Sequence, residues 1–446
     1  MSKLVFFEGL KEEIIRNNKI DPKFFEKYDV KQGLRDKDGT GVLAGLSGVS
    51  EVIGKEKVDW EVRPIDGILR YRGIHINDLV KDHTLTTRFL FEKITFLLLV
   101  GRMPSDEETQ LLTGIFDEDR ELPDGIIKLI QTVPSKTIMN QLQTAVSALY
   151  GFSETPDSLD PKENFLKSLD IIAKFPTIIA YAYLQAYDPN PVFVKPPKGK
   201  SVAESFLTML RKGKEPSTLE SAMLDLCLVL HADHGGGNNS TFTARVVTST
   251  QSDIFSAITA AIGSLKGPLH GGANQEVMGM MDDLKANVKD WGNRQQVRDY
   301  LTKLLKKEAH DHSGKIYGMG HAVYTLSDPR ALILKERAKS IAKEKGREKE
   351  LGLYLMIEEE APKLFVEIKG DKKIISPNVD FFSGYVYDCL GIPAEVYTSV
   401  FGMARVSGWA SHRIEEILNG KLIRPGYKFP KTTPVSASVA AGGNSR

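Results

Sequence analysis

Repeated helix-start signals constrain the fold of this chain more than any other feature of its sequence. An SDEE segment at 105–108 follows Pro104, and an STLE segment at 217–220 follows Pro216. In each segment the serine hydroxyl can accept a hydrogen bond from an amide of the first helical turn, while the glutamate reaches back to the serine amide. Apolar positions at helical spacing follow both segments. The sequence therefore predicts a mainly α fold.

Other stretches agree with this prediction. We expect a helix over 255–265, whose small side chains would let another helix approach closely. The proline-rich stretch at 188–200 predicts a connector. Strand signals are confined to a patch at 58–65, and the Asp-Gly pair at 66–67 predicts a hairpin-type turn at its end.

Composition excludes several classes of partner. The chain has 446 residues, enough for two or three domains, with 59 basic and 58 acidic side chains. This balance gives no electrostatic reason to expect nucleic acid or an anionic membrane. Only two cysteines occur, which argues against a disulfide framework and a thiolate metal site. The longest apolar run is too short to span a bilayer and the N-terminus lacks a secretory signal, so we expect a cytoplasmic protein.

Three of the nine histidines lie beside glycines, namely His234, His270 and His321. Glycine next to a polar side chain lets the backbone approach a ligand closely. A single histidine of this kind is more often structural, but three together indicate a ligand pocket.

One carboxylate also stands out. Asp380 is flanked by Val379 and by Phe381, so burial would raise its pKa and make its anion a better base. An equally good interpretation is a helix N-cap, because an aspartate after Pro-Asn suits that position.

Arginines complete the candidate set. Arg330 follows a Ser-Asp-Pro turn that would fix its direction, while Arg405 and Arg424 have apolar or turn residues around them. Arginines without a neighbouring carboxylate often pair with one on a ligand.

A metal site is the main alternative from a different class. His231, Asp233 and His234 have a spacing that could chelate zinc or iron, as in a metal-dependent hydrolase, but they lack a further histidine. The triplet at 310–312 (HDH) could in principle add ligands, but it lies in a charged run, and we expect it to be a solvated helix end. We therefore predict no metal. Phosphate-binding and serine-hydrolase motifs do not occur.

Four segments in this order closely resemble the citrate synthase family, and the resemblance covers about residues 45–430. They are HADHGGGN at 231–238, GPLHGGANQE at 267–276, GMGHAVYTLSDPRA at 318–331 and SPNVDFFSG at 376–384, with Arg405, IRP at 423–425 and IDGILRYRG at 65–73 as further matches.

The resemblance implies the citrate synthase fold, in which a large helical domain carries an inserted small helical domain and the active-site cleft lies between them. The large domain would cover 1–271, with a helical lead-in at 1–45, and the small domain 272–390. The chain would return to the large domain over 391–430 and end in a tail at 431–446. Family members are dimers or larger assemblies, and the segments 217–231 and 255–265 would suit the subunit interface.

The resemblance also implies an activity, the condensation of acetyl-CoA with oxaloacetate to citrate, without a cofactor. Asp380 would remove a proton from the acetyl methyl group, His270 would stabilise the enol or enolate, and His321 would act as acid on the oxaloacetate ketone. The residues that match the oxaloacetate site are His234, Arg330, Arg405, Asn238 and, reaching in from a neighbouring subunit, Arg424.

The CoA side departs from the family pattern. Many relatives carry a basic residue shortly after the position of His321, but the four residues at 322–325 include none. Lys315 and Lys372 are the candidates that could compensate, together with the backbone at Gly318 and Gly320. Two further alternatives remain open, a 2-methylcitrate synthase that uses propionyl-CoA and a catalytically inactive CoA-binding protein. The lead-in does not resemble the β-rich domain of NADH-regulated relatives, so we expect no such regulation.

Overall fold

The computed structural model describes residues 11–16, 18–36, 39–59, 61–133, 135, 137–370 and 375–429. The chain divides into two compact units, one of residues 45–422 and one that combines residues 1–44 with 423–446. The second unit contains the short helices α2 (Lys23–Lys27) and η1 (Gln32–Leu34). The predicted tail at 431–446 lies outside the described residues.

A long hairpin opens the larger unit. Strand β1 (Ser50–Val58) pairs antiparallel with β2 (Glu61–Tyr71), and β2 also pairs with the short β3 (Ile74–His75). The chain reverses between Val58 and Glu61, so the predicted turn at 66–67 is wrong. Asp66 and Gly67 lie inside β2, where Gly67 N donates to Ser327 O at 3.1 Å and Ser327 Oγ donates to Asp66 Oδ1 at 2.7 Å. This long-range contact, which local sequence does not reveal, replaces the turn.

Helices make up most of the rest, which confirms the predicted mainly α fold. The capping boxes at Ser105 and Ser217 form as predicted, and Ser201 makes a third. The stretch at 188–200 is a connector without helix, as expected. The helices before residue 270 are α3 (Ile76–Val80), α4 (Leu90–Val100), α5 (Asp106–Asp119), α6 (Asp124–Thr132), α7 (Ile138–Ala148), η2 (Leu149–Phe152), α8 (Pro161–Tyr187), α9 (Val202–Leu210), α10 (Thr218–His231), α11 (Asn239–Thr248) and α12 (Ile254–Leu265).

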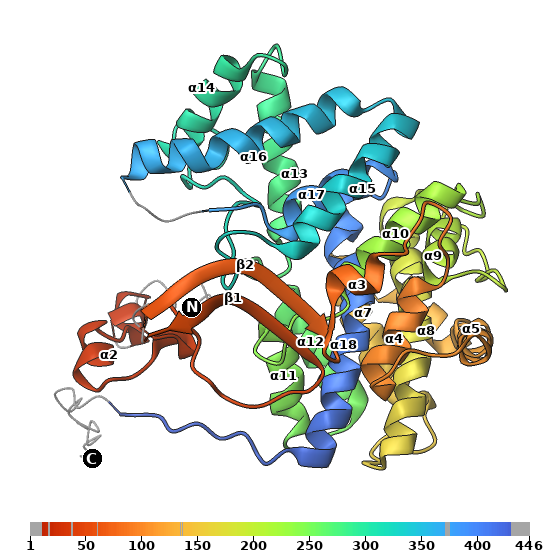
Figure 1. The fold of residues 1–446 in the computed structure, drawn as a ribbon. Coiled ribbons are helices and arrows are strands. Elements are labelled where there is room, and N and C mark those ends of the chain that lie inside the picture. Colours follow the sequence, from red (N-terminus) through yellow and green to blue (C-terminus); the bar gives the residue numbers. More distant parts are fainter. Residues whose placement is uncertain are drawn as a thin grey trace, which may run out of the picture. The chain divides into compact units, whose positions relative to one another are not determined.

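Helix α18 (Tyr397–Asn419), which follows η3 (Ala394–Val396), runs through the middle of this group (Figure 1). It packs against α4, α8, α10, α11 and α12, and buries Trp409 completely. Small residues on α18 allow these close approaches. At Gly408 an added Cβ would lie 2.3 Å from Asp233 Oδ1 and 2.6 Å from Ala232 O. The segment after α10 can therefore lie directly on the α18 backbone.

The remaining helices form a second group in the same unit. They are α13 (Ala273–Asn287), α14 (Arg294–Leu305), α15 (Pro329–Lys345), α16 (Glu348–Lys369) and α17 (Val379–Cys389). In Figure 1, α14 and α16 lie side by side across the top of this group, with α13 beneath them. Helix α17 packs against both α13 and α15.

Burial corrects one expectation about assembly. Every residue of α10 from Glu220 to His231 is buried within this single chain, so this helix offers no face to a second subunit. The prediction that it packs across a subunit interface is wrong. Among the described helices, none has both the length and the apolar character that crossing a lipid bilayer needs. Both cysteines are buried and unpaired.

The close packing at Gly408 generates a test. Gly408→Ala should lower the free energy of unfolding by about 1–3 kcal/mol, because the new methyl group overlaps Asp233. Gly352→Ala is the matched control, since Gly352 is an exposed helical glycine with nothing within 4 Å of the added Cβ. That change should raise stability by up to about 1 kcal/mol. The thermal unfolding midpoints of the two variants measure these changes in stability. Equal midpoints would contradict the close packing at Gly408.

Candidate active site

Two loops pair side by side and bring His321 to the start of α17. Gly320 N donates to Ser376 O at 2.7 Å, and Asn378 N donates to Gly318 O at 2.9 Å. The Asn378 side chain adds a hydrogen bond from Nδ2 to Gly320 O at 2.8 Å. Position 318 requires glycine, because its φ is +77° and an added Cβ would lie 2.8 Å from the Phe381 ring.

The surroundings of His321 define which ring nitrogen carries a proton. Its Nδ1 lies 3.0 Å from both Val323 N and Tyr324 N. Backbone amides only donate, so Nδ1 accepts and the neutral ring carries its proton on Nε2. The Tyr324 ring stacks on the imidazole at 4.7 Å between centroids and fixes its plane. His321 therefore presents an N–H donor from Nε2.

His270 has the opposite tautomer. Its Nε2 accepts from Ser240 N at 3.3 Å and lies 3.0 Å from Ser240 Oγ. The proton of the neutral ring is therefore on Nδ1. Burial, with the nearby charge of Arg405, lowers the pKa of His270 to about 4, so the ring is neutral at pH 7. His270 also lies just before helix α13, whose N-terminal dipole adds to this effect.

His234 is buried next to His321, with 5.2 Å between the ring centroids. Burial lowers its pKa well below the usual value, and the charges of Arg330 and Arg405 act in the same direction. Its Nε2 is buried and has no hydrogen-bond partner in the described part of the chain. A buried ring nitrogen of this kind is suited to a polar ligand, since leaving it unpaired is costly.

Asp380 lies in the first turn of α17, half-buried. The N-cap is Asn378, whose Oδ1 accepts from Asp380 N at 3.0 Å, so the interpretation of Asp380 as the cap is wrong. Burial raises the pKa of Asp380 to about 6, although Arg330 and Arg405 partly offset this effect. A carboxylate with this pKa is ionised at pH 7 and a stronger base than an exposed one.

Two buried arginines supply the positive charge of the site. Arg330 pairs bidentately with Asp328, from Nε at 3.0 Å and Nη2 at 2.8 Å. Asp328 also caps α15, which confirms that the turn before Arg330 fixes its direction. Arg405 donates to His231 O at 2.8 Å and to Asn238 Oδ1 at 3.2 Å. Burial lowers the pKa of Arg405 to about 10, so it remains charged at neutral pH.

Three predicted residues remain, Arg424, Lys315 and Lys372. Arg424 is exposed and belongs to the smaller unit. Lys315 lies on the face of the Tyr317 ring, 5.9 Å from its centroid. Lys372 falls outside the described residues.

The residues of the alternative metal site each have another role. His231 Nδ1 lies 2.7 Å from Cys227 O and therefore donates to it. The Asp233 carboxylate accepts hydrogen bonds from Ser50 Oγ, from Gly235 N at 3.0 Å and from His412 Nε2 at 3.1 Å. Within the described ranges, His231, Asp233 and His234 do not form a group of converging ligand atoms.

Asp233 belongs to a buried network that sequence reasoning missed. Arg245 Nη2 donates to His412 Nδ1 at 2.8 Å, so the His412 proton lies on Nε2 and points at Asp233. Burial alone would raise the pKa of Asp233, but His412, Arg405 and Ser50 hold it below its usual range. This network anchors the segment that carries His234. Arg245 and His412 are interior helix residues without a local motif, so nothing in the sequence indicated them.

Comparisons with known proteins identify the family of this chain. The family model "Citrate synthase, C-terminal domain" matches residues 39–426. Citrate synthase 2 of Bacillus subtilis is 37% identical over 388 residues, which are 86% of this chain and 93% of that protein. A 2-methylcitrate synthase of Shewanella oneidensis is 33% identical over 368 residues, which are 82% of this chain and 89% of that protein.

A solved structure is also similar. It is the ternary complex of carboxymethyl coenzyme A and oxaloacetate with citrate synthase from Thermoplasma acidophilum. It aligns with a TM-score of 0.73 and 28% identity, over 91% of this chain and 98% of that one. The chain belongs to the citrate synthase family.

The buried Asp233 network generates a second prediction. Asp233→Asn should cost about 1.5–3 kcal/mol of stability, because three donors lose a charged acceptor in a site without water access. The exposed Asp282, which pairs with Lys285, provides the control, and Asp282→Asn should change stability by no more than about 0.5 kcal/mol. Unfolding midpoints of the two variants should differ clearly, and equal midpoints would exclude an anchoring role for Asp233.

Proposed function

We propose that this protein is a citrate synthase, which condenses acetyl-CoA with oxaloacetate and water to citrate and CoA. One observation carries the proposal. A carboxylate with a raised pKa and two imidazoles of opposite, fixed tautomers gather around the buried charges of Arg330 and Arg405. The names of the related proteins support the same substrates, as do the CoA analogue and the oxaloacetate of the Thermoplasma acidophilum complex.

In the proposed reaction, Asp380 removes a proton from the acetyl methyl group. The methyl group beside a thioester is a very weak acid, so the carbonyl oxygen needs a donor at the same moment. His270 supplies it from Nδ1, which carries the proton because Nε2 accepts from Ser240 N. A neutral donor suits this role, since it stabilises the developing oxyanion without giving up its proton first.

The resulting enol or enolate carbon then attacks the oxaloacetate ketone. His321 donates from Nε2 to the ketone oxygen, polarises it and transfers a proton as the carbon–carbon bond forms. Water subsequently cleaves the thioester of citryl-CoA, releasing CoA and citrate. No step needs a redox or metal cofactor, so we propose none.

The two carboxylates of oxaloacetate are proposed to bind His234, Arg330 and Arg405. Among the described residues, the buried Nε2 of His234 has no hydrogen-bond partner, and both arginines remain charged despite burial. Asn238 orients Arg405 through its Oδ1. Arg424 is proposed to complete the site from a neighbouring subunit. CoA would contact the loop of Gly318 and Gly320, with Lys315 and Lys372 as candidates for its phosphates.

The assembly proposed for this chain is a homodimer in the cytoplasm. Helices α7 and α12 offer the face for it, since Gln143, Ser147 and Thr259 line a surface hollow of about 450 Å³ between them. Residues 272–390 would act as the small domain, which closes on 1–271 and 391–430 once oxaloacetate is bound.

The catalytic assignment predicts an activity and its loss. The wild-type protein should release thiol from acetyl-CoA only when oxaloacetate is present. Asp380→Asn should lower kcat by about 10²–10⁴-fold or more, because it removes the general base. Asp388→Asn is the control on the same helix, where the carboxylate pairs with Arg347, and should retain activity. Full activity of Asp380→Asn would refute the base assignment, and no thiol release by the wild type would refute the function.

The raised pKa of Asp380 predicts a pH dependence. The free enzyme needs the ionised carboxylate, so kcat/KM should fall tenfold per pH unit below about pH 6 and level off above it. Initial rates between pH 5 and 8, with acetyl-CoA and oxaloacetate both far below saturation, would measure this decline for the free enzyme. A midpoint near pH 4 would mean that the carboxylate is not desolvated in the working enzyme.

The alternative within the family is 2-methylcitrate synthase, which the Shewanella relative supports. Propionyl-CoA differs from acetyl-CoA by one methylene group. In an apolar pocket that group changes the binding free energy by only about 1–3 kcal/mol. We expect kcat/KM to be higher for acetyl-CoA than for propionyl-CoA with oxaloacetate. The reverse order would assign this chain to the methylcitrate branch.

A further inference from the structure

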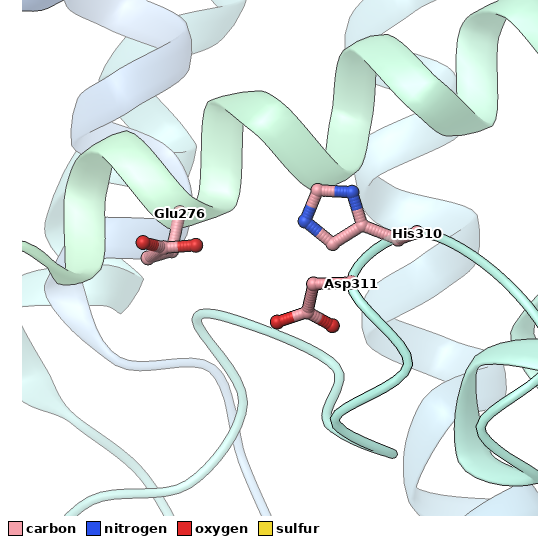
Figure 2. Close-up of side chains that lie close together, drawn as sticks. All are labelled: Glu276, His310 and Asp311. Carbon is pink, nitrogen blue, oxygen red and sulfur yellow. The ribbon is translucent and has the colours of Figure 1, made fainter. Parts of the chain in front are cut away.

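One histidine and two carboxylates converge outside the proposed catalytic and oxaloacetate-binding residues. Glu276 lies in the first turn of α13, while His310 and Asp311 lie in the loop that follows α14. One ligand atom from each lies within 4.8 Å of the others, and no other such group of three occurs in the part of the chain that the structure describes. Figure 2 shows the imidazole and the two carboxylates facing a common space beside α13.

The His310 ring is held in place with one nitrogen unsatisfied. It packs against Gly279 of α13, where an added Cβ would lie 3.5 Å from the ring, and it meets the Tyr317 ring edge-on at 6.0 Å. Its Nε2 is buried and has no hydrogen-bond partner among the described residues. In Figure 2 the ring turns one nitrogen toward the Glu276 side. The expectation that 310–312 is a solvated helix end is therefore wrong, because α14 already ends at Leu305.

Asp311 is fixed and ionised. Its Oδ2 accepts from the Tyr317 hydroxyl at 2.5 Å and its Oδ1 accepts from Ser313 N at 3.0 Å. The hydrogen bond from Tyr317 is the main cause that lowers the pKa of Asp311 to about 2. Each carboxylate oxygen has a second lone pair, so these bonds leave Asp311 able to coordinate a cation.

We propose that Glu276, His310 and Asp311 form a binding site for a divalent transition metal, of which Zn²⁺ is the best match. An imidazole nitrogen with two carboxylate oxygens suits zinc, whereas calcium and magnesium prefer oxygen ligands alone. Glu276 and Asp311 are exposed, so water completes the coordination. The long Glu276 side chain can move to bring the ligands to metal distance.

The proposed metal site would affect the structure of the active site. Helix α13 begins three residues after His270, and the loop that carries His310 continues to His321. A bound metal would therefore join the two segments that position the catalytic imidazoles, in addition to the hydrogen bonds within each.

The test uses the full-length protein stripped of metal, in a buffer without citrate, which would chelate zinc. Equilibrium dialysis against Zn²⁺ should give one ion per chain for the wild type. Affinity should fall at least tenfold in His310→Gln and in Glu276→Gln. His312→Gln is the matched control, because His312 lies in the same loop but outside the cluster, and should bind like the wild type. Zinc should raise the unfolding midpoint of the wild type and His312→Gln only.

Several outcomes would overturn the proposal. They are no stoichiometric zinc on the wild type, unchanged affinity in His310→Gln, or loss of zinc in His234→Gln instead, which would place the ion in the oxaloacetate site. Glu276→Gln changes an exposed side chain, so it decides the question if His310→Gln does not fold.

Discussion

The buried carboxylate of Asp328 links two segments of the proposed active site. It caps α15, pairs with Arg330 on that helix, and accepts a hydrogen bond from Val379 N at 3.1 Å, at the start of α17. Arg330 and the helix that carries Asp380 therefore share one anchor, seven residues after His321. Burial alone would raise the pKa of Asp328, but Arg330 keeps it ionised. Because an unpaired buried charge is costly, the carboxylate and the guanidinium hold each other in one position.

The same positive charges affect the pKa values of three titratable groups of the site. Arg330 and Arg405 lower the pKa of His234, and they partly offset the rise that burial causes in the pKa of Asp380. Arg405 also lowers the pKa of His270. A dianionic substrate seated on these arginines would cancel much of their field. The pKa of Asp380 would then rise further, so binding of the first substrate would make the base stronger for the second.

Features that depend on neighbouring residues could be predicted from the sequence, whereas contacts between distant residues could not. The capping boxes at 105–108 and 217–220 and the glycine-flanked histidines depend on neighbouring residues, and the structure contains them as predicted. The turn placed at 66–67 failed because Gly67 binds Ser327, which is 260 positions away. The contact between the His310 ring and α13 at Gly279 also joins two separate elements, so the sequence around His310 gave no sign of it. The tautomer of His270 likewise depends on the Ser240 amide, which lies 30 positions away in the sequence.

The position of α18 has a consequence for synthesis of the protein. This helix is near the end of the chain, yet Thr95 of α4 bonds to its Ser407 across 312 positions, and α8, α10, α11 and α12 also pack on it. While the chain is still on the ribosome, the helices made first have no central partner and leave apolar faces uncovered. A nascent chain would therefore depend on chaperones until α18 emerges, and premature termination shortly before residue 397 would yield an aggregation-prone product rather than a smaller folded domain.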